Sequence, residues 1–186
     1  DSENHIVFSK EDAVYKTNDG GELYTGTVPV KIVVTDTYSG IRSIEWSIKV
    51  PGSEASTQSG TVIVKNNKTL DDGSDSGWTW NEVDTEKNLI KVMEKTIQVI
   101  ENSNNIVVHV VMTDRAGNIS ENSVTFSVDN TAPTVTVTYD DDKSPADNGF
   151  PTFYKAPRTA TITVTERNFD PNAVQFDIKS AHSEKN

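Results

Sequence analysis

Residues 28–36 read VPVKIVVTD, and every even position through Val34 is apolar. A side-chain period of two is typical of a β-strand that buries one face. The sequence IEWSIK at 44–49 alternates in the same way, and β-branched residues dominate the other candidate strands. These further predicted strands cover residues 6–9, 61–65, 96–100, 106–113, 123–128, 134–139 and 159–165. Turn-forming Gly, Asn and Asp residues separate them, so the sequence predicts an all-β protein.

Residues 82–95 fit two kinds of structure. Leu89, Met93 and Ile97 fall at helical spacing, and the charges between them suit a helix. The overlapping sequence KTIQV at 95–99 alternates like a strand. We predict a strand here, which one helical turn could precede.

The alternating pattern returns when residue 30 is placed on residue 160, a shift of 130 positions. The aligned apolar pairs are Val30 and Ala160, Ile32 and Ile162, Val34 and Val164, Ile44 and Val174, Trp46 and Phe176, and Ile48 and Ile178. A register that holds through two strands without a gap indicates a tandem repeat. We predict a complete unit at residues 1–130 and the first three strands of a second unit at 131–186.

The second unit is short on this alignment, because Asn186 corresponds to residue 56 of the first. It then lacks the strands that should cover its apolar face, and a few uncovered strands are not stable alone. We expect the chain to be a fragment of a longer array. Its half repeat would then pack on another copy of the chain or on a neighbouring surface.

Three motifs carry a resemblance to a known family: MTDRAGN at 112–118, FSVDNTAP at 126–133 and TITVTERNFD at 161–170. Together with Trp46 on an early central strand, they resemble the bacterial immunoglobulin-like tandem repeats of large surface proteins, of adhesin type, in Gram-positive and related bacteria. The resemblance implies an immunoglobulin-like antiparallel β-sandwich without a disulfide. It also implies an extracellular protein, attached to the cell wall or cell surface, whose modules act as stalks, spacers or adhesive units.

The partners that the resemblance implies are neighbouring immunoglobulin-like repeats of the same chain and an unidentified host or glycan ligand. Surface sandwiches of Gram-positive bacteria can also carry a lysine–asparagine cross-link in place of a disulfide. By residue type, the candidates for such a cross-link are Lys31, Lys49, Asn105 and Asn118.

Composition and charge exclude several classes of function. The net charge of −11 disfavours nucleic acid and anionic lipid as partners. No stretch approaches about 20 consecutive apolar residues, so we expect no membrane insertion. The chain has no cysteine, and its histidines, including His109 in a valine-rich strand, match no catalytic motif. We therefore predict that the chain is not an enzyme.

Cations are the charged partners that suit an acidic chain, and calcium is the one cofactor that the sequence suggests. Acidic turns at 71–75 and at 140–142 with Asp147 offer hard oxygen ligands. A third candidate site joins the linker to nearby acids and consists of Asp129, Asn130, Asp114 and Asp36. None of the three has the spacing of an EF-hand loop, so solvated acidic turns are the open alternative.

Trp78 and Trp80 flank Thr79 and would point to one face of a strand. They could form a core patch or an exposed platform on which a sugar ring stacks. The second interpretation would make the chain an accessory, carbohydrate-contacting module of a large secreted enzyme that degrades glycans or peptides. Trp46 is predicted to lie in the core, because Phe176 repeats it in register.

Overall fold

The computed structural model describes residues 5–65, 68–140 and 159–178. By its internal contacts the chain divides into two compact units, Asp1–Asn130 and Thr131–Asn186. None of the described residues forms a helix with the length and hydropathy needed to cross a membrane.

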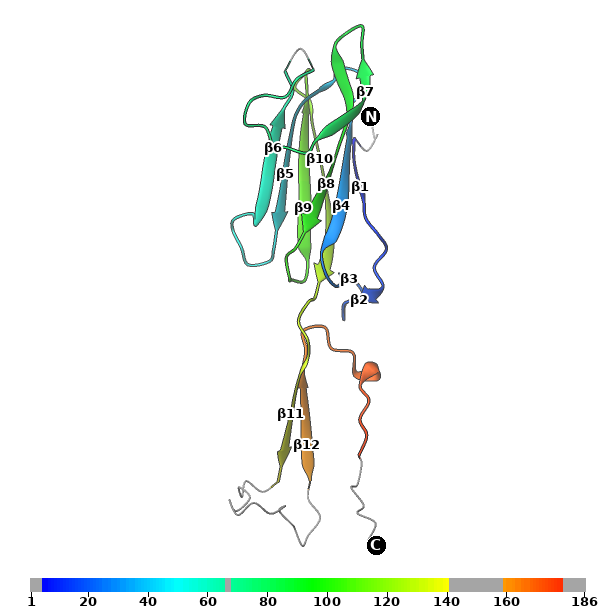
Figure 1. Cartoon of the computed structure of the whole chain (residues 1–186), viewed down its shortest axis with the longest axis vertical. Helices are drawn as coiled ribbons and strands as arrows, with labels where there is room; N and C mark the ends of the chain where they lie inside the picture. The colour runs from blue at the N-terminus through cyan, green and yellow to red at the C-terminus, as the bar shows by residue number, and fades with distance from the viewer. Residues whose placement is uncertain (1–4, 66–67, 141–158, 179–186) are drawn as a thin grey trace, which may run out of the picture. The chain divides into compact units, whose positions relative to one another are not determined.

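The first unit contains a four-stranded antiparallel sheet (Figure 1). Its strand order is β1 (Ile6–Ser9), β4 (Val28–Thr35), β8 (Leu89–Val99) and β7 (Thr79–Asp84). Strand β4 lies at the centre because it alternates without interruption and can pair on both sides. The odd-numbered residues of β4, such as Lys31, face outward, whereas Val30, Ile32 and Val34 are fully buried.

A second sheet of six strands lies against the first. Its order is β2 (Tyr15–Lys16), β3 (Glu22–Tyr24), β10 (Ile119–Val128), β9 (Ile106–Asp114), β5 (Ile41–Lys49) and β6 (Gln58–Ile63). All pairs are antiparallel except β3 with β10, where Leu23 lies beside Ser127 and Tyr24 beside Val128. The orders β1-β4-β8-β7 and β5-β9-β10 match the ABED and CFG sheets of an immunoglobulin-type sandwich. The predicted all-β antiparallel sandwich is confirmed.

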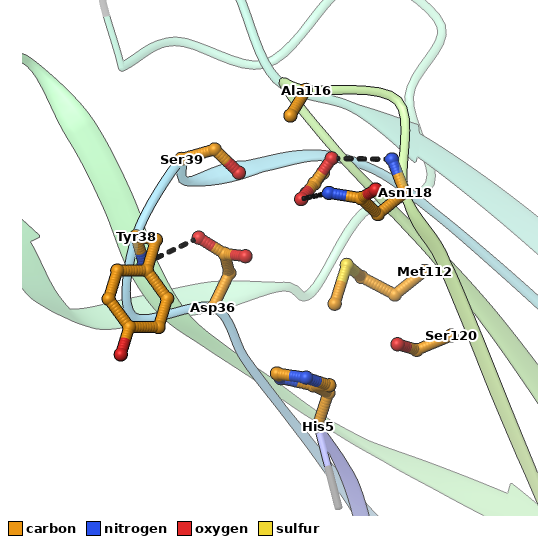
Figure 2. Close-up of a pocket in the computed structure, with 9 residues that line it drawn as sticks. His5, Asp36, Tyr38, Ser39, Met112, Ala116, Asn118 and Ser120 are labelled. Atoms are coloured by element: carbon orange, nitrogen blue, oxygen red, sulfur yellow. Dashed lines mark hydrogen bonds between the residues drawn. The ribbon is translucent and has the colours of Figure 1, made fainter. Parts of the chain in front are cut away.

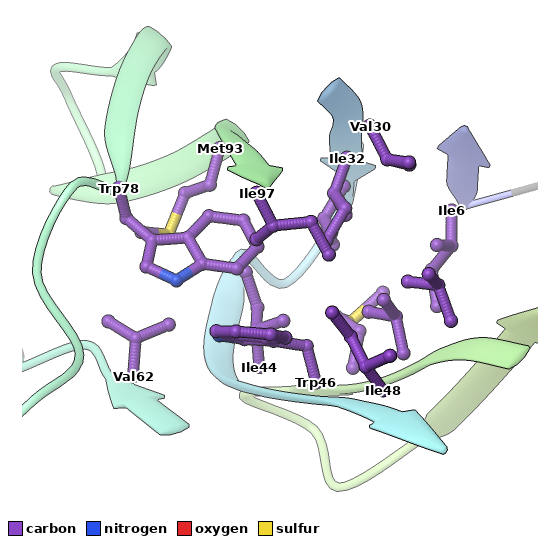
Figure 3. Close-up of a cluster of buried hydrophobic side chains, with 14 of the residues drawn as sticks. Ile6, Val30, Ile32, Ile44, Trp46, Ile48, Val62, Trp78, Met93 and Ile97 are labelled. Carbon is purple, nitrogen blue, oxygen red and sulfur yellow. The ribbon is translucent and has the colours of Figure 1, made fainter. Parts of the chain in front are cut away.

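The core lies between the two sheets and consists of aliphatic and aromatic side chains from both inner faces (Figure 3). Trp46 on β5 is buried, as its pattern predicts, and packs in the same cluster as Ile44 and Ile48. Phe126 from β10 is also buried, and its ring meets that of Tyr24 edge to face at 5.4 Å between centroids. The two sheets therefore pack on a shared apolar core, without a disulfide.

The ambiguous residues 82–95 form parts of β7 and β8, so the predicted strand is confirmed and the preceding helical turn is wrong. A tight turn at 85–88 joins the two strands instead. The Asp84 carboxylate accepts hydrogen bonds from the backbone N–H groups of Glu86 and Lys87, both at 3.1 Å, and Asn88 has φ = +58°. A left-handed residue ends the turn and returns the chain into β8 rather than into a helix.

The second unit contains one antiparallel pair, β11 (Thr134–Tyr139) with β12 (Ala160–Thr165), followed by the short 3-10 helix η1 (Pro171–Ala173). The Asp170 carboxylate begins η1 by accepting a hydrogen bond from the backbone N–H of Asn172 at 2.9 Å. Two predicted strands are thus present where the pattern places them.

The third predicted strand of the second unit is wrong for its described part, because residues 174–178 form no strand. Phe176, the counterpart of Trp46, is 75% exposed. The first unit explains this difference: β5 pairs with β6 and β9, and not with β4. Within the described second unit, residues 174–178 therefore have neither a counterpart of β6 nor a counterpart of β9 to pair with.

Candidate functional site

One end of the first sandwich carries a cavity of about 360 Å³. It lies where residues 36–40 connect β4 to β5 and where residues 115–118 connect β9 to β10. The side chains around it are shown in Figure 2. They are His5, Asp36, Tyr38, Ser39, Met112, Asp114, Ala116, Asn118 and Ser120. The fold thus brings two carboxylates together from connections that are far apart in the sequence.

Asp36 holds the β4–β5 connection in place. It is only 5% exposed, and its Oδ1 accepts hydrogen bonds from the backbone N–H groups of Tyr38, at 3.1 Å, and Gly40. Gly40 has φ = +87°, and a Cβ atom there would lie 2.9 Å from Cβ of Leu89. Glycine is therefore required at this position, and the carboxylate of Asp36 fixes the turn around it.

Asp114 does the same for the β9–β10 connection. It is 6% exposed, and its carboxylate accepts hydrogen bonds from the backbone N–H of Asn118 at 2.7 Å and from Nδ2 of Asn118 at 2.8 Å. Burial acts to raise the pKa of the Asp114 carboxyl, but these hydrogen bonds outweigh it and lower the pKa below its ordinary value. Asp114 is therefore a charged group within the fold.

The cavity offers oxygen acceptors but no activated nucleophile. Nδ1 of His5 lies 3.0 Å from the backbone oxygen of Thr35, and no hydrogen bond among the described residues joins this ring to Ser39 or Ser120. A serine hydroxyl without a base is a weak nucleophile at neutral pH. With two carboxylates in its lining, the arrangement can hold a cationic group.

The four predicted calcium ligands do not form one site. Asp36 and Asp114 line the cavity, but Asp129 and Asn130 follow β10, whereas Asn118 precedes it. The ten residues of β10 span about 33 Å, so the linker pair lies at the opposite end of the sandwich. The proposed sharing of one cation between the linker and these acids is therefore wrong for the first unit.

Calcium binding elsewhere stays a prediction. In the described parts of the chain, no group of three or more His, Asp or Glu side chains is placed to hold a metal ion. In the turn at 71–75, Asp71 lies 3.0 Å from the Lys65 amine and Asp75 lies 2.6 Å from the Lys95 amine, so lysines compensate both carboxylates. Asp141, Asp142 and Asp147 of the other acidic turn lie outside the described residues.

The two tryptophans of the predicted sugar platform have different surroundings. Trp78 is 5% exposed and packs in the core, whereas Trp80 on β7 is 38% exposed. Because Trp78 cannot present its ring face to a ligand, the pair does not form a stacking platform. The alternative interpretation, in which Trp78 belongs to the core, is the one that the structure favours.

Asp75 is a structural centre that the sequence did not reveal. Its Oδ2 accepts hydrogen bonds from Nε1 of Trp46 at 2.7 Å and from Nε1 of Trp78 at 3.1 Å, besides the Lys95 amine. The same amine lies 5.4 Å from the centroid of the Trp46 ring. The carboxylate thus joins β5 of one sheet to β8 of the other. A buried indole N–H group needs a hydrogen-bond acceptor, and this requirement was the feature of the sequence that could have pointed to the contact.

Replacing Gly60 by alanine should lower the free energy of unfolding by about 1–3 kcal/mol. A Cβ atom at residue 60 would lie 2.5 Å from Nε1 of Trp46 and 2.7 Å from Cγ of Asp75, so the bond between these two groups must shift. Urea unfolding followed by tryptophan fluorescence measures the loss. Ser59→Ala, on the exposed face of the same strand, is the control and should change stability little. Equal stabilities for the two variants would contradict the close contact.

Three of the four predicted cross-link residues take part in other contacts. Lys31 pairs with Glu94 at 2.9 Å, Asn118 binds Asp114, and the backbone N–H of Asn105 donates to Oγ of Ser127 at 3.0 Å. His109 lies on β9 with Nε2 at 3.5 Å from a carboxylate oxygen of Glu121. Among the described residues, the side chains of Lys31, Asn118 and His109 thus contact carboxylates close to them in the fold.

No family model matches this sequence, and no curated protein matches it either.

Proposed function

We propose that this chain is a non-catalytic, immunoglobulin-like module of a bacterial cell-surface protein and acts as a stalk, spacer or adhesive unit. The observation that carries the proposal is the path of the chain through the first unit. It begins at one end of the sandwich and leaves at the other, which suits a module in a linear array.

The two ends of the first unit are fixed by backbone hydrogen bonds. The N–H of Thr35, the last residue of β4, donates to the oxygen of His5 at 2.8 Å. The N–H of Asp129 donates to the oxygen of Tyr24, before β4, at 2.9 Å. The eight residues of β4 separate these points by about 26 Å. Tension on the chain would therefore act along the strands.

Asn130 ties the outgoing chain to the base of the sandwich. Its Oδ1 accepts hydrogen bonds from the backbone N–H of Gly26 at 2.5 Å and from Oγ1 of Thr25 at 3.5 Å. Its own N–H donates to Oδ1 of Asn102 at 3.2 Å. Together with the β3–β10 pair, these bonds would be loaded in parallel when the ends are pulled apart.

A repeated strand register supports the tandem arrangement. In the first unit Ile6 pairs with Val34 and Phe8 with Ile32. In the second unit Val135 pairs with Val164 and Val137 with Ile162, which places the same apolar pairs opposite each other. Both pairs of strands are thus built to the same plan.

The turns that follow β4 in the first unit and β12 in the second unit support the repeat as well. Oδ1 of Asp36 accepts from the backbone N–H of Tyr38 at 3.1 Å. Oε1 of Glu166 accepts from the backbone N–H of Asn168, the equivalent position, at 3.4 Å. The resemblance of the motifs at 112–118 and 126–133 to bacterial surface repeats supports the extracellular location that we propose.

The alternative, a carbohydrate-contacting module of a secreted enzyme, keeps only one of its two proposed contact residues. Trp80 remains accessible, but a single ring offers a small stacking surface. Glycan-array binding that Trp80→Ala abolishes would favour this alternative over a spacer.

Asn130→Ala should lower the force at which the first unit unfolds when it is pulled through its two ends. It should also lower the equilibrium free energy of unfolding by about 1 kcal/mol, since it removes exposed hydrogen bonds. Single-molecule pulling on the chain between flanking reference domains measures the force. Ser53→Ala is the control, because it removes one hydrogen bond, of 2.8 Å to the oxygen of Ala55, that lies wholly within the β5–β6 turn. Equal unfolding forces for the two variants would show that the Asn130 side chain does not resist the pulling force.

A further inference from the structure

The β11–β12 pair has two chemically different faces. Cross-strand pairing places Val135 opposite Val164 and Val137 opposite Ile162. The other face consists only of threonines, which are Thr134, Thr136, Thr138, Thr161, Thr163 and Thr165. The two valine-containing pairs form an apolar face, which Tyr139 opposite Ala160 completes. No charged side chain belongs to this face. A face of this kind is made to be buried.

The apolar face is exposed among the described residues. Val135 is 60% exposed and Ile162 is 50% exposed, whereas their counterparts in the pairing plan of the first unit, Ile6 and Ile32, are 2% and 0% exposed. Two strands do not form a stable sheet in water unless an apolar layer covers them. Equivalent positions are thus buried in one unit and open in the other.

The first unit shows what kind of layer fits this face. Its β1–β4 pair is covered by the inner face of β5, β9 and β10, which contributes Ile48, Val108, Val110 and Phe126 to the common core. These side chains alternate along antiparallel strands, so they form a flat apolar layer like the face they cover. The pairing plan is the same in both units, and the cover that suits one therefore suits the other.

We propose that the apolar face of β11–β12 is a docking surface for a β-sheet with the apolar pattern of β5, β9 and β10, joined to it in cis. The inference rests on the proposed tandem repeat and deepens it by naming the layer that completes the second unit. Because the face is apolar and uncharged, a strongly charged partner would leave its charges without water or a counter-charge.

The test supplies this layer from the chain itself. The fusion protein consists of residues 1–166 followed directly by residues 37–130. The junction lies after Glu166 because this residue corresponds to Asp36 in the repeat, so residue 37 keeps the position that it has in the first unit. Hydrogen exchange read by mass spectrometry follows the backbone amides of residues 134–139 and 160–165. We expect these amides to exchange at least about tenfold more slowly in the fusion than in the unmodified chain, because the covered pair opens rarely.

Two matched variants of the fusion separate the faces. Val137→Asp places a charge on the apolar face and should restore fast exchange, whereas Thr136→Asp, one residue away on the threonine face, should leave the protection intact. Fast exchange in the unmodified fusion, or equal effects of both variants, would overturn the proposal. So would protection in the unfused chain that rises with concentration and disappears with Val137→Asp, because a second copy would then be the occupant. Each of these results leaves the pulling experiment on the first unit unaffected, so the two proposals fail separately.

Discussion

Replacing Asp75 by alanine should lower the free energy of unfolding of the first unit by about 3–5 kcal/mol. The substitution removes the common acceptor of three donors, Trp46 Nε1, Trp78 Nε1 and the Lys95 amine. The Lys95 amine would remain largely buried without its carboxylate, and the two indole N–H groups would lose their partner. A buried donor without an acceptor costs about 1–3 kcal/mol, and an unpaired buried charge costs more.

Chemical unfolding at neutral pH, followed by tryptophan fluorescence, measures this loss. Asp72→Ala is the control, since Asp72 is exposed in the same turn and the change in composition is identical. Asp75→Asn keeps an oxygen acceptor for the indoles but removes the charge, so its loss should be intermediate. If Asp75→Ala is no less stable than Asp72→Ala, the cluster does not stabilise the fold.

The pH dependence of stability should follow the same carboxylate. Burial acts to raise the pKa of Asp75, but hydrogen bonds from Lys95 and Trp46 and the charge of Lys95 outweigh it and hold the pKa below its ordinary value of 3.8. A lowered pKa in the folded state means that the ionised group stabilises the fold above pH 3.8 and loses this effect as the pH falls through the folded value.

Sequence patterning predicted the strands whose apolar residues alternate, including β11 and β12 although their residues are largely exposed, and gave no clear strand where alternation is absent. Residues 28–36 and 106–113 alternate because alternate side chains enter the core. Strand β7, at the edge of its sheet, has no fully buried residue, and β3 has only Leu23. Strand β7 buries too little to leave a period of two in its sequence, so its position depends on pairing with β8.

The contacts around Asp36, Asp75 and Asp114 could not be predicted for a different reason. Asp36 and Asp75 lie in connections and Asp114 is the last residue of β9, so their surroundings are set by which connections the sandwich brings to the same place. The alternation of Trp78 and Trp80 predicted a shared face, yet Trp78 precedes β7 and the pairing of β7 shifts register after Trp80. Local period therefore did not determine the exposure of these two rings.

Replacing Asp114 by alanine should have the second largest effect and lower the free energy of unfolding by about 2–4 kcal/mol, because two hydrogen bonds to a buried charge are lost. Both bonds come from Asn118, through its backbone N–H and its side-chain amide. The backbone N–H cannot turn to another acceptor while β9 and β10 remain paired from Thr113 and Ile119 onward. The loss should therefore appear as lower stability of the whole unit rather than as a local change of the turn.

Urea unfolding at neutral and acidic pH tests both the size and the origin of this effect. The pKa of Asp114 is lowered from 3.8 in the folded state, so its contribution is complete at neutral pH and disappears as the pH falls through the folded value. The difference between the original protein and Asp114→Asn should therefore shrink on acidification. Glu54→Gln, which changes an exposed carboxylate in the β5–β6 turn, is the control at neutral pH and should alter stability little there. A difference that stays constant with pH would mean that Asp114 stabilises the turn through shape alone, and that its charge contributes nothing.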